Sequence, residues 1–287
     1  MKRIALIGAD GQLGSDLLET LSGEDVHPLY YPEFDVTHPE ESGRVLREIS
    51  PGIVINTSAF HRVDECESRP LEAFRVNAFA VRDLARVCRD IEAVLVHFST
   101  DYVFDGRKKT PYTEDDPPNP QSVYAVSKLA GEYFVRNIAP RHFVIRTCGL
   151  FGRAGCREKG RNFVESMIAL ADSGKPIRVV DDQTVAPTST LELADRTSAL
   201  LDTDGYGLYH LTSRGQCTWY EFARAIFDAL GRKPDLVPIT TQELAAPALR
   251  PGYSILDAGR AEKSGLAKMS LWNDALNQYL KLKRVIR

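Results

Sequence analysis

Tyr124 and Lys128 are spaced to act on one reacting group. Residues four apart share one face of a helix, so both side chains can point at the same carbonyl. A lysine ammonium lowers the pKa of a neighbouring phenol from about 10 toward neutral pH, which prepares Tyr124 to donate a proton. Thr100 follows the apolar run 94–96 and offers a hydroxyl to the same oxygen. We therefore predict Thr100, Tyr124 and Lys128 as the catalytic residues of a carbonyl reduction.

A tyrosine four residues before a lysine is a weak signal by itself, and the chain contains a second such pair at Tyr279 and Lys283. No strand-end hydroxyl precedes this second pair, and we interpret it as part of a solvent-exposed helix face. The pair at 124 and 128 differs because Ser99 and Thr100 precede it by the length of one loop and one helix start.

Gly8, Gly11 and Gly14 stand between the apolar run 4–7 and a helical pattern. A strand, a glycine-rich turn and a helix in this order let the backbone approach a pyrophosphate and aim helix N–H groups at its charge. Glycine is also common in ordinary strand-to-helix turns. The three glycines are more informative here because they lie in the first strand-helix unit of a chain in which strands and helices alternate. The predicted ligand is a dinucleotide, whose ribose Lys128 and Tyr124 would hold.

The residues after the second predicted strand do not choose between NADPH and NADH. That strand ends near 29–32, without an acidic residue for a ribose 2′-hydroxyl or a basic one for a 2′-phosphate. Asp35 and Val36 could sit against the adenine, although a simple turn is the alternative role of Asp35. Asn77 would hold Lys128 through a backbone carbonyl and water, unless it is an ordinary helix-surface asparagine.

Apolar runs and helical patterns alternate along the first half of the chain, as at 4–7, 53–55, 94–96 and 143–145. Short apolar strands between amphipathic helices indicate parallel strands covered on both faces. We therefore expect an α/β fold, a Rossmann-like doubly wound parallel sheet with a smaller C-terminal substrate-binding lobe. Residues 1–147 would form the dinucleotide-binding domain, completed by part of 177–210. Residues 148–287 would mostly form the substrate-binding lobe, which would be discontinuous.

The composition excludes several other classes. The 287 residues carry a net charge of −3 and no broad basic field, so nucleic acid is not an expected partner. Five scattered cysteines without C-x-x-C spacing argue against a disulfide framework and a metal site. No apolar stretch has the length of a signal or membrane segment. We expect a cytoplasmic protein, with a homodimer left open.

Taken in order, a series of motifs closely resembles the dTDP-4-dehydrorhamnose reductase family of extended short-chain dehydrogenases. The match covers nearly the whole chain and rests on Gly8-Ala-Asp-Gly11-Gln12-Leu13-Gly14, Asp35-Val36-Thr37, Val54-Ile55-Asn56-Thr57-Ser58-Ala59-Phe60, Val63-Asp64-Glu65-Cys66-Glu67, Ser99-Thr100-Asp101-Tyr102-Val103-Phe104-Asp105-Gly106, Tyr124-Ala-Val-Ser-Lys128, Asn162-Phe163-Val164, Ala186-Pro187-Thr188 and Arg250-Pro251.

The resemblance implies reduction of the 4-keto group of dTDP-4-dehydro-L-rhamnose to dTDP-L-rhamnose. Tyr124 would act as the acid, Thr100 would bind the carbonyl and Lys128 would support both. The residues that would line the cofactor are Gly11, Gln12, Leu13, Asp35, Val36, Ser58, Ala59, Phe60 and Phe98. Those that would face the nucleotide sugar are Asp101, Tyr102, Asn162 and Arg250.

One position departs from the family. Members usually carry a tryptophan after the fifth strand that packs on the sugar, whereas Gly149 stands at that place in the sugar site. The sugar platform is thus missing or rebuilt, and the identity of the sugar stays open. The basic loop with Arg153, Arg157, Lys159 and Arg161 would supply diphosphate contacts, or would simply be solvated.

Two alternatives to the reductase remain. A nucleotide-sugar epimerase or 4,6-dehydratase would use the same scaffold, but dehydratases need an Asp-Glu pair after the threonine, and Tyr102 follows Asp101. The methionine adenosyltransferase beta subunit also resembles these reductases, so a non-catalytic NADP-binding regulatory subunit is the second alternative. The presence of Thr100, Tyr124 and Lys128 favours an enzyme, because a binding module needs no proton donor.

Overall fold

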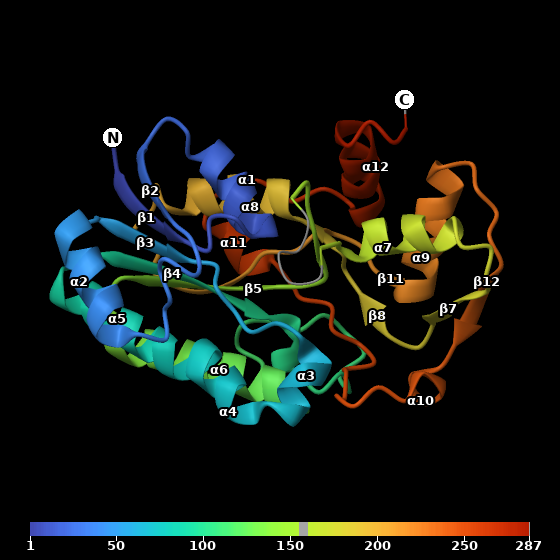
Figure 1. The fold of residues 1–287 in the computed structure, drawn as a ribbon, viewed down its shortest axis with the longest axis horizontal. Helices are drawn as coiled ribbons and strands as arrows, with labels where there is room; N and C mark the ends of the chain where they lie inside the picture. Colours follow the sequence, from blue (N-terminus) through green and yellow to red (C-terminus); the bar gives the residue numbers. More distant parts are fainter. Residues whose placement is uncertain (155–159, 287) are drawn as a thin grey trace.

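A six-stranded parallel sheet forms the centre of the larger lobe. A computed structural model describes residues 1–154 and 160–286, and Figure 1 shows this lobe beside a smaller one. The strand order is β2-β1-β3-β4-β5-β10. The strands are β1 (Arg3–Ile7), β2 (Asp25–Leu29), β3 (Ile53–Asn56), β4 (Val94–Thr100), β5 (His142–Thr147) and β10 (Gly207–His210). The predicted doubly wound parallel sheet is confirmed.

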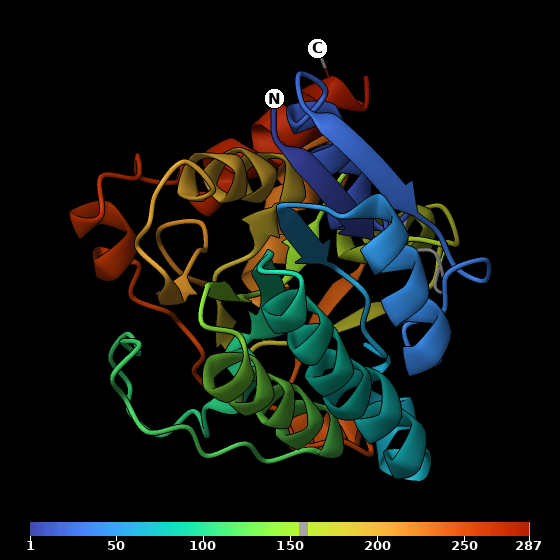
Figure 2. The ribbon, with the colours of Figure 1, turned by 90° about the vertical axis from the view of Figure 1, so that its left-hand side faces the viewer.

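Helices cover both faces of this sheet, which is why its strands are apolar on both sides. In β1, Ile4 and Leu6 join the core of one face, and Ala5 and Ile7 join the core of the other. The first face carries α1 (Gln12–Thr20) and α8 (Thr190–Leu200), and the second carries α2 (Pro39–Ile49), α5 (Ala80–Asp90) and α6 (Val123–Ile138). Figure 2 shows the gold α8 above the sheet and the cyan and green α5 and α6 below it.

Two connections at the carboxyl edge of the sheet contain short helices. Between β3 and α5 the chain forms α3 (Val63–Ser68), α4 (Pro70–Phe74) and the π-helical turn η1 (Arg75–Phe79). After β4 it forms the 3₁₀ turn η2 (Asp101–Val103) before the loop that leads into α6. Tyr124 therefore lies in the first turn of a helix whose start depends on how this loop is held.

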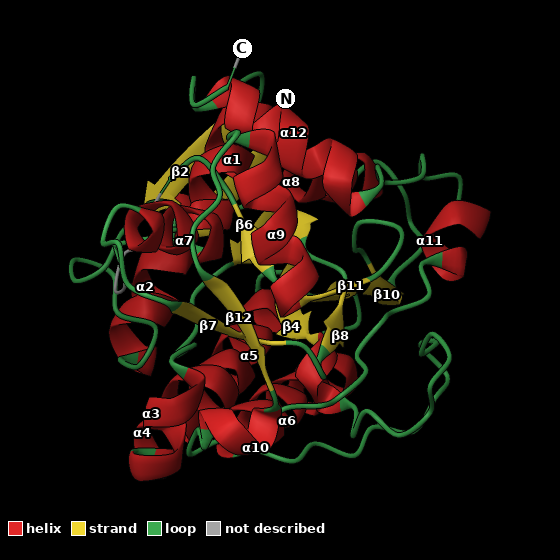
Figure 3. Cartoon of the chain, turned by 90° about the vertical axis from the view of Figure 1, so that its right-hand side faces the viewer, coloured by secondary structure: helices red, strands yellow, loops and turns green. Residues whose placement is uncertain are grey.

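The smaller lobe is built around three two-stranded pairings and a core of aromatic side chains. Its strands are β6 (Leu150–Phe151) with β9 (Thr188–Ser189), β7 (Ile177–Val180) with β12 (Leu236–Ile239), and β8 (Thr184–Val185) with β11 (Cys217–Thr218). Its helices are α7 (Phe163–Ala171), α9 (Trp219–Ala229), α10 (Thr241–Leu244) and α12 (Trp272–Leu282). Figure 3 looks onto this lobe, with α7 and α9 in front.

The chain crosses between the lobes more than once. Within the range 177–210, β7 pairs with β12 in the smaller lobe, whereas α8 and β10 lie with the parallel sheet. The short helix α11 (Gly259–Lys263) packs beside β10, and its Ala261 joins the core of the sheet. Each lobe thus contains pieces from distant parts of the sequence.

A buried ion pair holds α6 against the sheet. Glu132 on α6 accepts two hydrogen bonds from Arg146 on β5, at 2.9 and 2.7 Å, and a third from the Ser99 hydroxyl on β4 at 2.5 Å. Glu132 and Arg146 are 0% and 1% exposed. The Arg146 guanidinium also lies over the Phe104 ring, 5.1 Å from its centroid. One carboxylate thereby fixes the helix to the ends of two neighbouring strands, one turn after Lys128.

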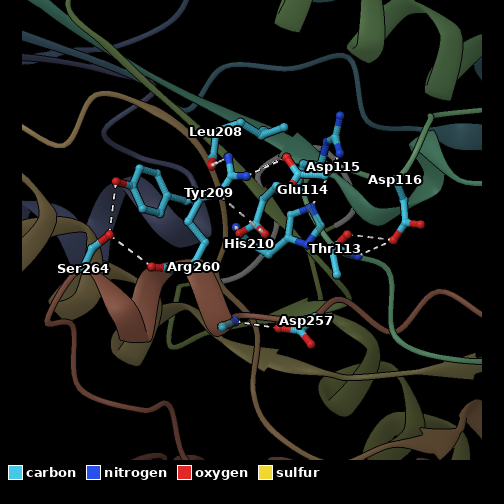
Figure 4. Close-up of polar contacts among 12 residues, drawn as sticks. Thr113, Glu114, Asp115, Asp116, Leu208, Tyr209, His210, Asp257, Arg260 and Ser264 are labelled. Carbon is cyan, nitrogen blue, oxygen red and sulfur yellow. Dashed lines mark hydrogen bonds and ion pairs between the residues drawn. The ribbon is translucent and has the colours of Figure 1, made fainter.

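The loop before α6 is held against β10 and α11, as Figure 4 shows. Glu114 accepts a hydrogen bond from the His210 backbone N–H at 3.0 Å, and the His210 ring contacts the Tyr112 carbonyl at 3.1 Å. Arg260 on α11 donates to Asp115 at 2.7 Å. Burial raises the pKa of the Glu114 carboxyl. These contacts fix the path of the chain between Thr100 and Tyr124.

Over residues 1–154 and 160–286, no helix is long and apolar enough to span a bilayer. The same ranges contain no group of three His, Cys, Asp or Glu side chains placed to bind a metal ion. The four cysteines in these ranges, Cys66, Cys88, Cys148 and Cys217, are all buried and none of them forms a disulfide with another.

We predict that Glu132→Gln lowers the free energy of unfolding by about 3 kcal/mol, because it leaves the Arg146 charge buried without its counter-ion. Urea denaturation measures the change. The matched control is Glu48→Gln, which breaks an exposed ion pair with Arg44 and should cost less than about 0.5 kcal/mol. Equal effects of the two substitutions would contradict a special role for the buried pair.

Candidate active site

A cleft of about 1010 Å³ opens at the carboxyl ends of β1, β3, β4 and β5. It lies where the strand order reverses about β1, the place at which open α/β sheets bind their ligands. Three predicted site residues, Gly14, Asn77 and Arg250, are not in its wall. The predicted residues that line it are Gly8, Gly11, Gln12, Leu13, Asp35, Val36, Ser58, Ala59, Phe60, Phe98, Thr100, Asp101, Tyr102, Tyr124, Lys128, Gly149 and Asn162.

The glycine turn has the geometry of a dinucleotide cradle. Gly8 has φ +75°, and a Cβ on it would lie 2.7 Å from the Thr57 hydroxyl oxygen. A Cβ on Gly14 would lie only 2.1 Å from the Gly8 carbonyl oxygen, so Gly14 lets α1 pack directly on the turn. At the start of α1, Gln12 presents a buried Oε1 without a hydrogen-bond partner among the described residues. These residues fit a pyrophosphate at the helix N-terminus.

Asp35 serves both as a turn residue and as part of the cleft wall. Its Oδ1 accepts a hydrogen bond from the Thr37 backbone N–H at 2.8 Å, which is the predicted alternative role. Asp35 and the buried Val36 also line the cleft beyond the glycine turn. The two roles are therefore compatible: Oδ1 accepts the hydrogen bond of the turn, and Asp35 still lines the cleft.

The structure brings Thr100 and Tyr124 together at the edge of the sheet. The Thr100 hydroxyl accepts a hydrogen bond from the Tyr102 backbone N–H at 3.2 Å and lies near enough to Tyr124 to lower the pKa of its phenol. Burial outweighs this effect and raises the pKa of Tyr124 above its usual value. The predicted lowering of the Tyr124 pKa toward neutral pH is wrong for this geometry, because desolvation of the phenol dominates. The phenol is consequently protonated at neutral pH, as a proton donor must be.

Lys128 is almost fully buried, with 2% of its surface exposed. Burial lowers the pKa of its ammonium to about 8, and Glu132 partly offsets this shift. Its Nζ lies 3.4 Å from Nε2 of His97, a buried side chain that the sequence analysis missed. Burial and the neighbouring Lys128 hold the pKa of His97 well below its usual range, so the imidazole is neutral. A buried histidine inside a strand gave no signal in the sequence.

The orientation of His97 depends on two residues at the end of β3. Oδ1 of Asn56 accepts hydrogen bonds from the Ser58 backbone N–H and hydroxyl at 3.1 and 2.6 Å. The amide Nδ2 of Asn56 therefore faces Nδ1 of His97, at 3.4 Å. Ser58 in the cleft wall is thus linked by hydrogen bonds through Asn56 to His97, whose Nε2 side faces Lys128.

Asn77 is fully buried, so its interpretation as a helix-surface asparagine is wrong. It lies in η1, and its side chain exchanges hydrogen bonds with the backbone N–H and carbonyl of Phe60 at 2.9 and 3.0 Å. It also donates to the Ser127 hydroxyl at 3.0 Å, next to Lys128 in the sequence. Asn77 thus joins the Phe60 wall of the cleft to α6.

On the other side of Thr100, Asp101 and Tyr102 enter the cleft from η2. Burial raises the pKa of Asp101 to about 6, and its Oδ1 accepts a hydrogen bond from Thr100 at 3.1 Å. Arg250 lies behind Tyr102: its guanidinium interacts with the Tyr102 phenol and donates to Asp64 at 2.9 Å. The predicted substrate contact of Arg250 stays a prediction, and the contact that the structure shows is with Tyr102.

Asn162 is at the cleft wall with its amide N–H groups already in use. They donate to the Gly152 carbonyl at 3.0 Å and to the Tyr279 hydroxyl at 3.1 Å, while its Oδ1 caps α7 by accepting from Glu165 N–H. Tyr279 is only 4% exposed. The prediction that Tyr279 belongs to a solvent-exposed helix face is therefore wrong, because its ring packs in the core of the smaller lobe.

The basic loop after β6 divides its charges between different roles. Arg153 pairs with Asp16 at 3.1 Å and with Glu19 on α1, so it ties the loop to the cradle helix instead of reaching a diphosphate. Arg161 lines the cleft. Arg157 and Lys159 lie outside the described residues.

Two further wall residues escaped the sequence analysis. Thr147 ends β5 directly beside Thr100, and its buried hydroxyl has no hydrogen-bond partner in the described part of the chain. Thr147 follows the apolar run 143–145 much as Thr100 follows the run 94–96, and this parallel could have pointed to Thr147 in the sequence. Trp219 lines the cleft from α9, 72 residues after Thr147 in the chain. No local pattern marked it, because only the packing of the two lobes brings it to the cleft.

The sheet, the glycine cradle and the Tyr124-Lys128 pair define the class of protein: a Rossmann-type dinucleotide-binding enzyme of the short-chain dehydrogenase kind. Comparison with known proteins then identifies the family. A model described as RmlD substrate binding domain matches residues 1–285, and the chain belongs to this family.

Curated relatives match almost the whole chain. It is 40% identical to a dTDP-4-dehydrorhamnose reductase of Streptomyces griseus, over 96% of this chain and 92% of the relative. It is 41% identical to a probable dTDP-4,6-dihydroxy-2-methyloxan-3-one 4-ketoreductase of Streptomyces antibioticus, over 96% and 94%. A crystal structure of dTDP-4-dehydrorhamnose reductase from Bacillus anthracis in complex with NADP superposes with a TM-score of 0.94 at 35% identity, covering 98% of this chain and 99% of that one.

We predict that Gly14→Ala weakens NADPH binding by about 5- to 150-fold, because the added methyl group would force α1 away from the turn at a cost of about 1–3 kcal/mol. Isothermal titration calorimetry measures the dissociation constant. Gly23→Ala is the control, since a Cβ there meets nothing within 4 Å and should leave binding unchanged. An unaltered dissociation constant in Gly14→Ala would show that the close packing is unimportant for the cradle.

Proposed function

We propose that this protein uses NADPH or NADH to reduce the 4-keto group of a dTDP-linked 6-deoxysugar, with dTDP-4-dehydro-L-rhamnose as substrate and dTDP-L-rhamnose as product. The observation that carries the proposal is the meeting of Thr100, Tyr124 and Lys128 in the same cleft as the glycine cradle. The names of the relatives, which include two kinds of dTDP-sugar ketoreductase, support the reaction class.

The reduced nicotinamide supplies the hydride when it is bound. Tyr124 donates its phenolic proton to the carbonyl oxygen of the sugar as negative charge develops there. Thr100 would turn its single hydroxyl hydrogen bond from Asp101 Oδ1 to the same oxygen, which would stabilise that charge before the proton arrives. Both groups come from the edge of the sheet that α6 and β4 share, so the carbonyl is held between two rigid elements.

Lys128 supports this step from behind Tyr124. Its ammonium would hold the cofactor ribose and stabilise the phenolate that remains after proton transfer. Because the imidazole of His97 is neutral, Lys128 is the only positive charge of this pair of side chains. Burial of the ammonium makes its charge sensitive to pH near 8, more than two units below the usual lysine value of 10.5.

The residues of the cleft wall support a division of labour between the lobes. We assign the dinucleotide to the larger lobe, centred on 1–147, and the sugar nucleotide to the part of 148–287 that forms the smaller lobe. Asp101, Tyr102, Gly149, Asn162 and Arg250 would border the sugar. Buried cysteines without a disulfide among the described residues fit a reducing compartment, and we propose a cytoplasmic location.

We predict that Tyr124→Phe lowers kcat at least about 100-fold while the dissociation constant of NADPH changes less than about threefold, because only the proton donor is removed. The assay follows NADPH absorbance with enzymatically generated dTDP-4-keto-6-deoxysugar. Tyr133→Phe is the matched control, since Tyr133 lies on the same helix and is exposed. Equal rates for the natural chain and Tyr124→Phe would refute the role of Tyr124. A natural chain that binds NADPH without ever oxidising it would instead favour the regulatory-subunit alternative.

We also predict that kcat/KM falls as pH rises through about 8, because the Lys128 ammonium loses its proton there. An exposed lysine would stay charged for two further pH units. Lys128→Arg should have a lower maximal kcat/KM, but the arginine stays charged at high pH. The pH at which kcat/KM falls should therefore be higher in this variant. If kcat/KM of Lys128→Arg falls at the same pH as that of the natural chain, a group other than Lys128 causes the fall.

A further inference from the structure

Trp219 is one of two aromatic side chains, with Phe163, that the described part of the smaller lobe contributes to the cleft wall. It is the first residue of α9, and its neighbours in the wall include Gly149, Asn162 and Phe163. None of these residues belongs to the cradle side, which is formed by the turn after β1 and the segments after β2 and β3. The indole therefore borders the half of the cleft that is left for the substrate.

The ring is held in place from three directions. Thr218 caps α9 and forms a reciprocal capping box with Glu221, at 3.0 and 2.9 Å. The Thr218 hydroxyl also donates to Asp181 at 2.6 Å. The Phe163 ring, at the first position of α7, packs against the indole with centroids 4.8 Å apart. Trp219 is thus a rigid surface, half-buried in the aromatic core of its lobe.

Gly149 is what allows the indole to approach the reacting end of the cleft. Gly149 has φ +52°, and a Cβ there would lie 3.2 Å from Cη2 of Trp219. Gly149 comes two residues after Thr147, which pairs directly with Thr100 across the sheet. The edge of the indole therefore lies against Gly149, just beyond the end of β5. At that end, Thr147 is the neighbour of the carbonyl-binding Thr100.

We propose that Trp219 is the platform on which the sugar ring of the nucleotide sugar packs, and that Gly149 makes the space for it. The inference rests on the proposed function, since it names a substrate-positioning residue for that reaction. Aromatic faces carry negative charge density and pack well on the partly positive C–H groups of a sugar face, and binding pockets commonly use them beside a few polar groups. The platform would orient the ring so that its 4-keto group meets Thr100 and Tyr124.

Intrinsic fluorescence tests the contact directly, because the chain has only two tryptophans. Trp272 packs edge-on to Phe222 in the core of the smaller lobe, at 5.8 Å, and does not line the cleft. In Trp272→Phe, Trp219 is the sole emitter, and we expect dTDP-glucose to change its emission more than dTDP does. In Trp219→Phe, the remaining Trp272 should not respond. An emission of Trp219 that ignores dTDP-glucose at saturating concentration overturns the proposal.

Steady-state kinetics gives the second readout. Trp219→Ala should raise KM for the 4-keto sugar nucleotide about tenfold, the loss expected for an aromatic platform, while the dissociation constant of NADPH stays constant. Trp219→Phe should recover most of the affinity, and Trp272→Phe should leave both constants unchanged. If Trp219→Ala instead weakens NADPH and spares the sugar, the indole contacts the nicotinamide and the proposal fails. If the natural chain never turns over but Trp219 still responds to dTDP-glucose, the proposed reaction fails and the platform stands.

Discussion

The buried pair of Glu132 and Arg146 is the interaction on which the site depends. It joins α6 to β5, and the Ser99 hydroxyl extends it to β4, so the helix cannot slide along the ends of the strands. Thr100 follows Ser99, and Lys128 precedes Glu132 by one turn. The same contacts that stabilise the sheet therefore set the distance between the carbonyl-binding hydroxyl and the Tyr124-Lys128 pair. An ion pair in such a dry position is costly to break, which makes it a rigid support.

The surroundings of Lys128 show how burial adjusts a reactive group. Desolvation lowers the pKa of its ammonium and also keeps His97 neutral, so one positive charge remains behind the phenol instead of two. Burial raises the pKa of Tyr124 and keeps it protonated. The hydrogen bonds from Ser58 to Asn56, and from there to His97, run from the cleft wall into this region. The dinucleotide side and the proton-transfer side are thus parts of one packed network.

The smaller lobe completes the cleft with residues that are fixed by helix capping. Asn162 and Thr218 cap α7 and α9, and the residues that follow them, Phe163 and Trp219, pack against each other at the wall. The predicted loss or rebuilding of a sugar platform at Gly149 has a structural counterpart, since the indole of Trp219 lies against that glycine. A residue type missing from one element can in this way be supplied by a neighbouring element of the same wall.

The sequence by itself determined the parallel sheet, the glycine cradle and the positions of Thr100, Tyr124 and Lys128, because strand period, glycine spacing and helical spacing are local properties. It did not reveal His97, Thr147 or Trp219, nor that Asn77 and Tyr279 are buried. It left Arg153 to a diphosphate or to solvent, whereas the guanidinium pairs with Asp16 on α1. These features depend on contacts between residues far apart in the chain. Only the tertiary structure decides which distant side chains meet, how completely they lose water, and therefore what charge they carry.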